Sequence, residues 1–175
     1  MGKCGVKWGK NFYLCGENKY KDVRMRFLGN IEAKTDAKGR AFLPATFRKV
    51  LQASGEDCLI LRKDVFQKCL VLYPESVWNQ RLDLLKAQLK PWKQAHQQVF
   101  RQFVSEAEVV TLDGNGRFLI SRRLQKIADI DQDIQFIGMD NTIEIWSPKI
   151  LQQTLKSEED FGIEFENIMN ANENI

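Results

Sequence analysis

A chain of 175 residues, 43% of them hydrophobic, can form one ordinary domain or two very small ones with a buried core. The sequence has no run of about 20 apolar residues that would span a bilayer, and its basic start lacks the apolar stretch of a secretory signal, so we expect a soluble, cytoplasmic protein without membrane contacts. The net charge of +3 is too small to indicate a polyanionic partner by itself, and residues 1–24, with six basic and two acidic side chains, hold the whole excess.

Residues 1–24 combine scattered lysines and glycines with brief apolar patches, and they follow neither helical nor strand periodicity. We predict a flexible basic N-terminal extension. Two interpretations stay open: an arm that helps to hold a polyanion, or an extension without fixed structure. Met25 is an alternative start of the chain.

The four cysteines form no C-x-x-C pair, and the single histidine, His96, is distant from all of them in sequence. We therefore expect no metal site and no cofactor. Cys58 and Cys69 stand within apolar runs, which favours core packing. His96 lies in an amphipathic stretch, as helix-surface and helix-packing histidines do, and no phosphate-binding glycine loop precedes a helix, so we expect no catalytic residues and no enzyme activity.

A turn-forming sequence, DAKGR at residues 36–40, separates two short apolar segments. This pattern predicts a β-hairpin with a three-residue loop. Gly39 supplies the left-handed backbone position that such loops require, and Asp36 can accept hydrogen bonds from the loop amides. Because the loop is so short, we expect Asp36 and Arg40 to be neighbours at its mouth.

The next segments alternate between helix and strand patterns. Pro44 opens a predicted helix from Ala45 to Leu51, and two apolar runs, Cys58–Leu61 and Cys69–Tyr73, predict buried strands. Helical spacing from Glu75 continues beyond Pro91, so we expect a helix pair or a kinked helix across residues 75–104. The apolar positions of the two parts are Trp78, Leu82, Leu85 and Leu89, then Trp92, Ala95, Val99 and Phe103.

The D-x-x-x-R pattern occurs again at residues 113–117, 77 positions later. The same offset superposes further pairs: Gly39 on Gly116, Phe42 on Leu119, Leu43 on Ile120, Phe47 on Leu124 and Val50 on Ile127. Downstream the offset is 73, which aligns Leu70 with Ile143 and Tyr73 with Trp146. Such self-similarity indicates an internal repeat. Half-repeats of about 45 residues are too small to fold alone, so we expect a shared core in which strands of both halves interleave.

The acidic tail after residue 156 keeps Phe161, Phe165, Ile168 and Met169 at helical spacing. A helix of this kind either packs on a neighbouring subunit or frays.

These motifs resemble the MraZ family, whose members are tandem versions of the AbrB/SpoVT swapped-hairpin domain. The resemblance runs from about Met25 to Lys156 and rests on both D-x-x-x-R loops, on Gly29-Asn30, on Leu43-Pro44 and on Leu72-Tyr73-Pro74 followed by Trp78. It implies an α+β, β-rich fold: a pseudo-two-fold swapped-hairpin (AbrB-like) β-barrel with flanking helices. The expected division is an extension (1–24), a first repeat (25–76), a helical connector (77–104), a second repeat (105–149) and an acidic helical or disordered tail (150–175).

The resemblance also implies a bacterial transcriptional regulator, cytoplasmic and nucleoid-associated, that acts at the promoter of the cell-division and cell-wall gene cluster, its own promoter included. Similar proteins assemble as rings, and the D-x-x-x-R loops are the elements that contact DNA. This carries over to Arg40 and Lys38 in the first loop and to Arg117 in the second. Asn115 stands where the first loop has Lys38, so we expect the first loop to matter more.

An arginine at the mouth of a hairpin can read guanine in the major groove through two parallel hydrogen bonds. Asp36, Asp113, Gly39 and Gly116 would orient the two loops. Lys34 lies near the first loop and could contact a phosphate, and a solvated surface charge is the alternative interpretation for it. The alternative interpretation is that each Asp and Arg form only a surface ion pair worth about 0–1 kcal/mol. The duplication and the resemblance favour the binding function.

Few cations occur per chain, so we expect one subunit to bind double-stranded DNA weakly. A homo-oligomer, in this family a ring, would gain affinity on promoter direct repeats about one helical turn apart. A protein-interaction scaffold is the rival hypothesis, in which the apolar helix stripe and the acidic tail bind protein partners.

Overall fold

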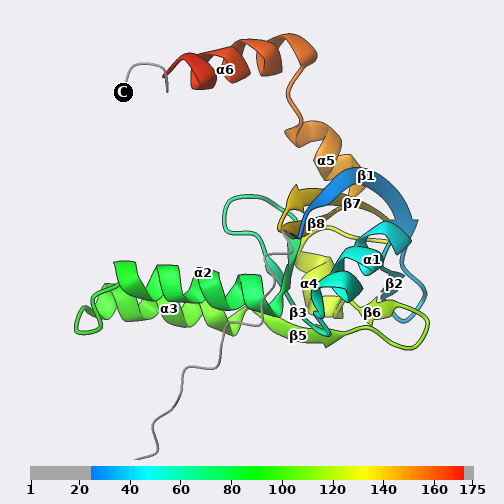
Figure 1. Cartoon of the computed structure of the whole chain (residues 1–175), viewed down its shortest axis with the longest axis horizontal. Coiled ribbons are helices and arrows are strands. Elements are labelled where there is room, and N and C mark those ends of the chain that lie inside the picture. The colour runs from blue at the N-terminus through cyan, green and yellow to red at the C-terminus, as the bar shows by residue number, and fades with distance from the viewer. Residues whose placement is uncertain (1–24, 172–175) are drawn as a thin grey trace, which may run out of the picture.

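The computed structural model describes residues 25–171, so the predicted N-terminal extension lies outside the described residues (Figure 1). The first repeat contains β1 (Phe27–Lys34), β2 (Arg40–Phe42), α1 (Ala45–Ser54), β3 (Cys58–Lys63) and β4 (Leu70–Pro74). A helical hairpin follows, made of α2 (Glu75–Gln88) and α3 (Gln94–Ser105). The second repeat contains β5 (Glu108–Thr111), β6 (Arg117–Leu119), α4 (Arg122–Ile127), β7 (Asp133–Asp140) and β8 (Thr142–Trp146). The chain continues with α5 (Pro148–Thr154) and α6 (Glu158–Ala171).

Six strands form an antiparallel sheet in the order β1-β7-β8-β4-β3-β5, and β2 and β6 form a separate two-stranded ribbon. In the repeat, β1 corresponds to β5 and β3 to β7. The first strand of each half therefore pairs with the third strand of the other half, and the predicted interleaving is confirmed. Barrel closure is not shown: among the described strands, β1 and β5 are the sheet edges and are not paired with each other.

The predicted hairpin around residues 36–40 forms only at its turn. Asp36 N donates to Arg40 O at 2.8 Å, and Thr35 faces Ala41 in a single bridge. Beyond this point β1 pairs with β7 and β2 pairs with β6, so the expectation of two mutually paired strands was wrong. The reason is burial: pairing β2 with β6 places Ala41 opposite Phe118, and these side chains are 0% and 2% exposed.

Both repeats share one hydrophobic core, as their small size requires. Phe47 of α1 and Leu124 of α4, equivalent positions in the repeat, are both buried. Phe27 meets Phe47 edge to face with ring centroids 5.6 Å apart, and Phe118 lies 6.3 Å from Phe136. Each of these pairs joins a strand of the sheet or ribbon to another element, so the ribbon, α1 and α4 are held against one face of the sheet.

α2 and α3 lie side by side and project from the sheet, which confirms the predicted helix pair (Figure 1). Trp78 of α2 stacks on Phe103 of α3 with centroids 5.3 Å apart and ring planes 5° from parallel. The predicted apolar stripe of the second helix was wrong at Trp92 and Val99, which are 95% and 55% exposed. Trp92 precedes α3, and the α3 side chain that stacks on α2 is Phe103.

The base of this hairpin covers a buried guanidinium. Arg62 of β3 is 3% exposed, and its Cζ lies 4.2 Å from the centre of the Phe103 ring. Its Nη2 approaches Glu106 Oε2 at 3.4 Å, while Nε and Nη1 have no hydrogen-bond partner among the described residues. The Phe103 face and the Glu106 carboxylate are therefore both partners of this cation.

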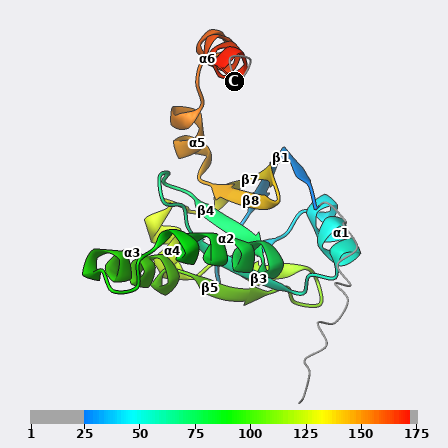
Figure 2. The ribbon, with the colours of Figure 1, turned by 60° about the vertical axis from the view of Figure 1, so that its left-hand side comes forward.

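Beyond β8, the small α5 packs on the sheet through Leu151, which clusters with Trp146 and Cys69. The expected core packing of Cys69 is confirmed, and Cys58 is half-buried. α6 confirms the helical spacing of the tail as far as Ala171 and stands apart from the body (Figure 2). None of the helices in residues 25–171 is long and apolar enough to cross a membrane.

Candidate nucleic-acid interface

In the first loop, Asp36 binds both the backbone and the side chain of its partner. Asp36 Oδ1 accepts from the amides of Lys38 and Arg40, each at 2.9 Å. Asp36 Oδ2 accepts from Arg40 Nε at 2.8 Å and from Nη2 at 2.7 Å. Gly39, with φ of 82°, donates its amide to Asp36 O at 2.8 Å and closes the turn. One carboxylate thus holds the loop backbone and the guanidinium at the same time.

The second loop repeats this arrangement. Asp113 Oδ1 accepts from the amides of Asn115 and Arg117, each at 2.9 Å, and Oδ2 accepts from Arg117 Nε at 2.8 Å. Gly116 has φ of 79° and donates its amide to Asp113 O at 2.8 Å. Two sequences 77 positions apart therefore produce the same hydrogen-bonded loop.

These contacts lower the pKa of both aspartates. For Asp36, the hydrogen bond from the Arg40 amide, followed by that from the Arg40 side chain, brings the pKa to about 2. For Asp113, the Arg117 amide is the main cause of a shift in the same direction. Both carboxylates are therefore charged at neutral pH and keep their arginines paired.

The β2–β6 ribbon brings the two arginines onto one surface. Arg40 pairs with Leu119 and Phe42 pairs with Arg117, and paired residues of antiparallel strands point to the same side. That side faces outward, since Phe42 and Leu119 are 55% and 52% exposed. Arg40 and Arg117 are diagonal neighbours in this register, with Cα atoms about 7–8 Å apart. The Arg117 Cζ lies 5.6 Å from the centre of the Phe42 ring.

Each loop is also fastened to the other repeat. Leu43 N donates to Gly116 O at 3.0 Å, and Ile120 N donates to Gly39 O at 2.9 Å. These symmetric bonds attach the backbone of one loop to the strand that leaves the other. The two loops are consequently parts of one unit rather than independent hairpin tips.

The remaining predicted site residues surround this ribbon. Lys38 and Asn115 are exposed in the two loops, and Lys38 lines a polar pocket of about 370 Å³ with Arg122. Lys34, at the loop end of β1, is 71% exposed and pairs with Asp133 at 3.1 Å. All five predicted DNA-contacting residues thus lie in the two loops or at the β1 end that leads into the first.

Two further residues contact the loops and were not predicted from the sequence. Arg48 of α1 packs on the second loop, so closely that a Cβ built on Gly116 would lie 2.5 Å from its Nη1. Gln125 of α4 packs on Gly39 in the same way and donates to Ile120 O at 2.8 Å. The 77-residue offset superposes Arg48 on Gln125, so the repeat itself contained the signal. Arg48 brings a cation to the loop that has Asn115 in place of lysine.

Comparison with known proteins identifies the family. Residues 26–99 and 103–169 match the model of the family described as MraZ protein. The transcriptional regulator MraZ of Phocaeicola vulgatus is 62% identical over 151 residues, which cover 86% of this chain and 98% of that protein. The MraZ regulator of Bacteroides thetaiotaomicron is 59% identical over 146 residues, with coverage of 83% and 94%.

A more distant MraZ regulator, from Christiangramia forsetii, is 34% identical over 146 residues, again with coverage of 83% and 94%. The resemblance predicted from the two loops is confirmed, and it places the chain outside the enzymes. The chain belongs to the MraZ family of transcriptional regulators and contains two MraZ repeats.

Proposed function

We propose that this regulator reads double-stranded DNA through the outer face of the β2–β6 ribbon. The observation that carries this proposal is the diagonal placement of Arg40 and Arg117 on an exposed ribbon, each held by its own aspartate. The major groove admits a two-stranded ribbon, and a guanidinium can bond guanine O6 and N7 together. The aspartates reduce the side-chain freedom that the arginines would lose on binding.

The apolar residues of this face suit base contacts of another kind. Phe42 and Leu119 are exposed between the two arginines. Apolar side chains in the major groove recognise the methyl group of thymine. A face that alternates arginine with an apolar side chain would therefore favour sites that combine guanine with thymine.

The surrounding cations would hold the phosphate backbone. Lys38 and Lys34 serve the first loop, and Arg48 serves the second, where Asn115 adds a neutral hydrogen-bonding group. Our prediction that the first loop matters more rests on Lys38. Arg48 reduces the expected difference, because it supplies a positive charge to the second loop from α1.

The wider regulatory role follows from family membership. We propose that the targets are direct repeats upstream of the cell-division and cell-wall gene cluster, including the promoter of this gene, and that the protein acts in the nucleoid as a ring. Each chain offers one ribbon, so binding to repeats by linked subunits would raise affinity without new contacts.

The first test compares arginine-to-alanine variants on the DNA upstream of the gene, with fluorescence anisotropy at two salt concentrations. Arg40→Ala should cost about 1–3 kcal/mol per site in discrimination between cognate and scrambled repeats, which is a factor of about 5–150. Arg117→Ala should have the same kind of effect. Lys38→Ala should weaken binding to both DNAs alike and reduce the slope of log affinity against log salt by about one per contact.

Arg26→Ala is the matched control. Arg26 is 58% exposed and pairs with Asp140 at 3.5 Å, just before the start of β1 and at the end away from the loops. Its loss removes the same charge from a paired surface arginine and should leave discrimination unchanged. Equal discrimination by wild type, Arg40→Ala and Arg117→Ala would refute the proposed reading surface.

A further inference from the structure

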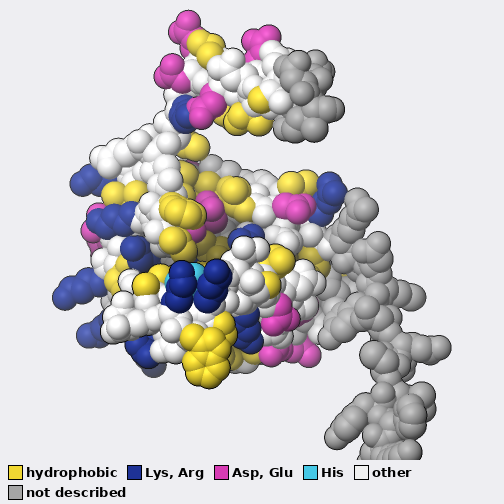
Figure 3. Space-filling model, turned by 90° about the vertical axis from the view of Figure 1, so that its left-hand side faces the viewer, with side chains coloured by type: hydrophobic (Ala, Val, Ile, Leu, Met, Phe, Trp, Pro, Cys, Tyr) yellow, Lys and Arg dark blue, Asp and Glu magenta, His cyan; other side chains and the backbone are white. Residues whose placement is uncertain are grey.

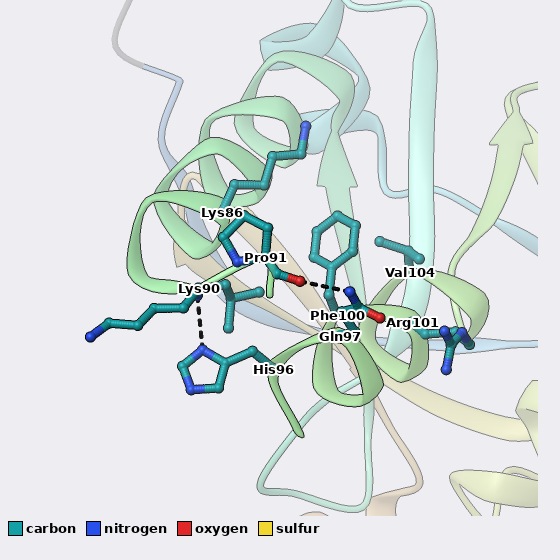
Figure 4. Close-up of a pocket in the computed structure, with 9 residues that line it drawn as sticks. Lys86, Lys90, Pro91, His96, Gln97, Phe100, Arg101 and Val104 are labelled. Carbon is teal, nitrogen blue, oxygen red and sulfur yellow. Dashed lines mark hydrogen bonds between the residues drawn. The ribbon is translucent and has the colours of Figure 1, made fainter. Parts of the chain in front are cut away.

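The outer face of the α2–α3 hairpin carries a groove that the DNA-binding proposal does not use. Its volume is about 620 Å³, and it lies toward the free end of the hairpin. Figure 3 looks at this end and shows yellow apolar side chains between dark blue basic ones, and Figure 4 shows the lining residues. The groove has an apolar floor, formed by Leu89, Phe100 and Val104. Its rim is basic and is formed by Lys86, Lys90 and Arg101.

The floor and rim are held in place by the turn between the helices. Lys90 N donates to His96 Nδ1 at 3.0 Å, and Gln97 Nε2 donates to Pro91 O at 2.6 Å. These bonds fix the end of α2 against the start of α3 (Figure 4). His96 is thus a packing residue, as expected from the sequence. The lining contains no acidic side chain, so the three basic side chains give it a net positive charge.

α6 has the complementary features. Phe161, Phe165 and Met169 recur every four residues and so share one face, and they are 61%, 56% and 54% exposed. The helix also carries five acidic side chains and no basic one. Glu159 and Glu166, seven residues apart, follow one edge beside the apolar face. An apolar stripe of this size is expected to be covered by a partner.

The groove and the helix match in chemistry. The apolar face of α6 fits the apolar floor, and its acidic edge fits the basic rim. A helix laid in a groove between two helices is a recurrent mode of recognition.

A second copy of the chain fits this groove better than the chain's own tail. α6 is joined to α5 by residues 155–157, which span about 11 Å at most. Lys156 in this connection also forms an ion pair with Glu164 of α6. α5 is anchored on the sheet through Leu151, and Figures 1 and 2 both show α6 standing apart from the α2–α3 hairpin.

We propose that α6 of one copy docks into the α2–α3 groove of the next copy. The contact is head to tail, since each copy gives a helix to one neighbour and a groove to the other. Repetition of such a contact builds a closed ring when its rotation closes, and an open filament otherwise. This inference rests on the oligomeric part of the proposed function and assigns the surfaces that join the subunits.

The experiment measures the mass of the full-length chain without DNA, by size-exclusion chromatography with light scattering. The wild type should have the mass of two or more chains of 20.3 kDa each. Phe161→Ala with Phe165→Ala should reduce the mass to that of one chain, and so should Lys90→Glu with Arg101→Glu. Phe66→Ala is the control, because Phe66 is 90% exposed in the β3–β4 loop, and it should keep the wild-type mass.

Mixing the two kinds of variant distinguishes contacts between chains from contacts within one chain. The phenylalanine variant has an intact groove, and the groove variant has an intact helix, so together they should form a 1:1 complex of twice the chain mass. A wild type that runs as one chain, variants that keep the wild-type mass, or a mixture that stays at one chain mass would each overturn the proposal. Discrimination by Arg40 on a single DNA repeat tests the reading surface separately and does not depend on these masses.

Discussion

Replacement of Gly39 by alanine tests the loop geometry on which the reading surface depends. At φ of 82° a residue with a side chain is strained by about 1–2 kcal/mol. The added Cβ would also collide with the Gln125 amide and lie 2.8 Å from Ile120 O, a backbone atom. To relieve this collision, the segment after β6 has to move, and with it Ile120, whose amide donates to Gly39 O. Loss of that hydrogen bond lowers the free energy of unfolding by a further amount of about 0.5–1.5 kcal/mol.

The sum is a destabilisation of about 1.5–3.5 kcal/mol. Gly55→Ala is the matched control, because Gly55 ends α1 with φ of 71° and has open space where the Cβ would lie. It should show the backbone strain alone. The free energy of unfolding of both variants is measured by denaturant titration. The chain concentration is kept fixed, because the stability of an oligomer depends on it. Equal losses for the two variants would show that the loop is not packed against the second repeat as described.

Two further predictions concern charge and packing. The pKa of Asp36 is lowered to about 2, against about 3.9 in an unfolded chain, so the stability from its carboxylate is present above pH 4 and is lost as pH falls toward 2. The stability difference between wild type and Asp36→Asn should therefore shrink over this range in denaturant titrations, and a difference that stays constant would exclude a charged pair with Arg40. Phe103→Ala should cost about 2–4 kcal/mol, because it opens a cavity and uncovers the buried Arg62 guanidinium. Trp92→Ala, at a 95% exposed site, should stay within about 0.5 kcal/mol in the same unfolding assay.

The loops could be predicted from the sequence because turn chemistry is local. An aspartate that accepts amide bonds and a glycine at positive φ leave few alternatives over five residues. The partner of β2 could not be predicted in this way. β2 has three residues, and its partner β6 lies 77 positions away. Periodicity indicates which side chains face a core, while the choice of neighbouring strand depends on the burial that the whole fold achieves.

Helix faces were predictable where an anchor residue is fully buried and less so elsewhere. Trp78 is 7% exposed and sets the face of α2, whereas α3 has no buried residue. Its orientation is decided by the stacking of Phe103 on Trp78 and on Arg62, contacts between residues 25 and 41 positions apart. Arg48 could not be identified for another reason. An arginine in an amphipathic helix is usually a solvated surface residue, and only the fold shows that Arg48 packs on Gly116 of the second loop.

The cross-repeat bonds change what the two loops mean for recognition. The Gly39 and Gly116 carbonyls accept from strands of the opposite repeat, and the β2–β6 register sets the distance between Arg40 and Arg117. A flexible hairpin tip would present its arginine in many positions and lose that freedom on binding. Here the spacing of both arginines is a property of the shared core, so a repeat by itself has neither the packing nor the loop support to present one. Under the proposed function, the two halves of the duplicated sequence therefore make one reading surface, which would explain why the loop motif and the core positions recur together at the same offset.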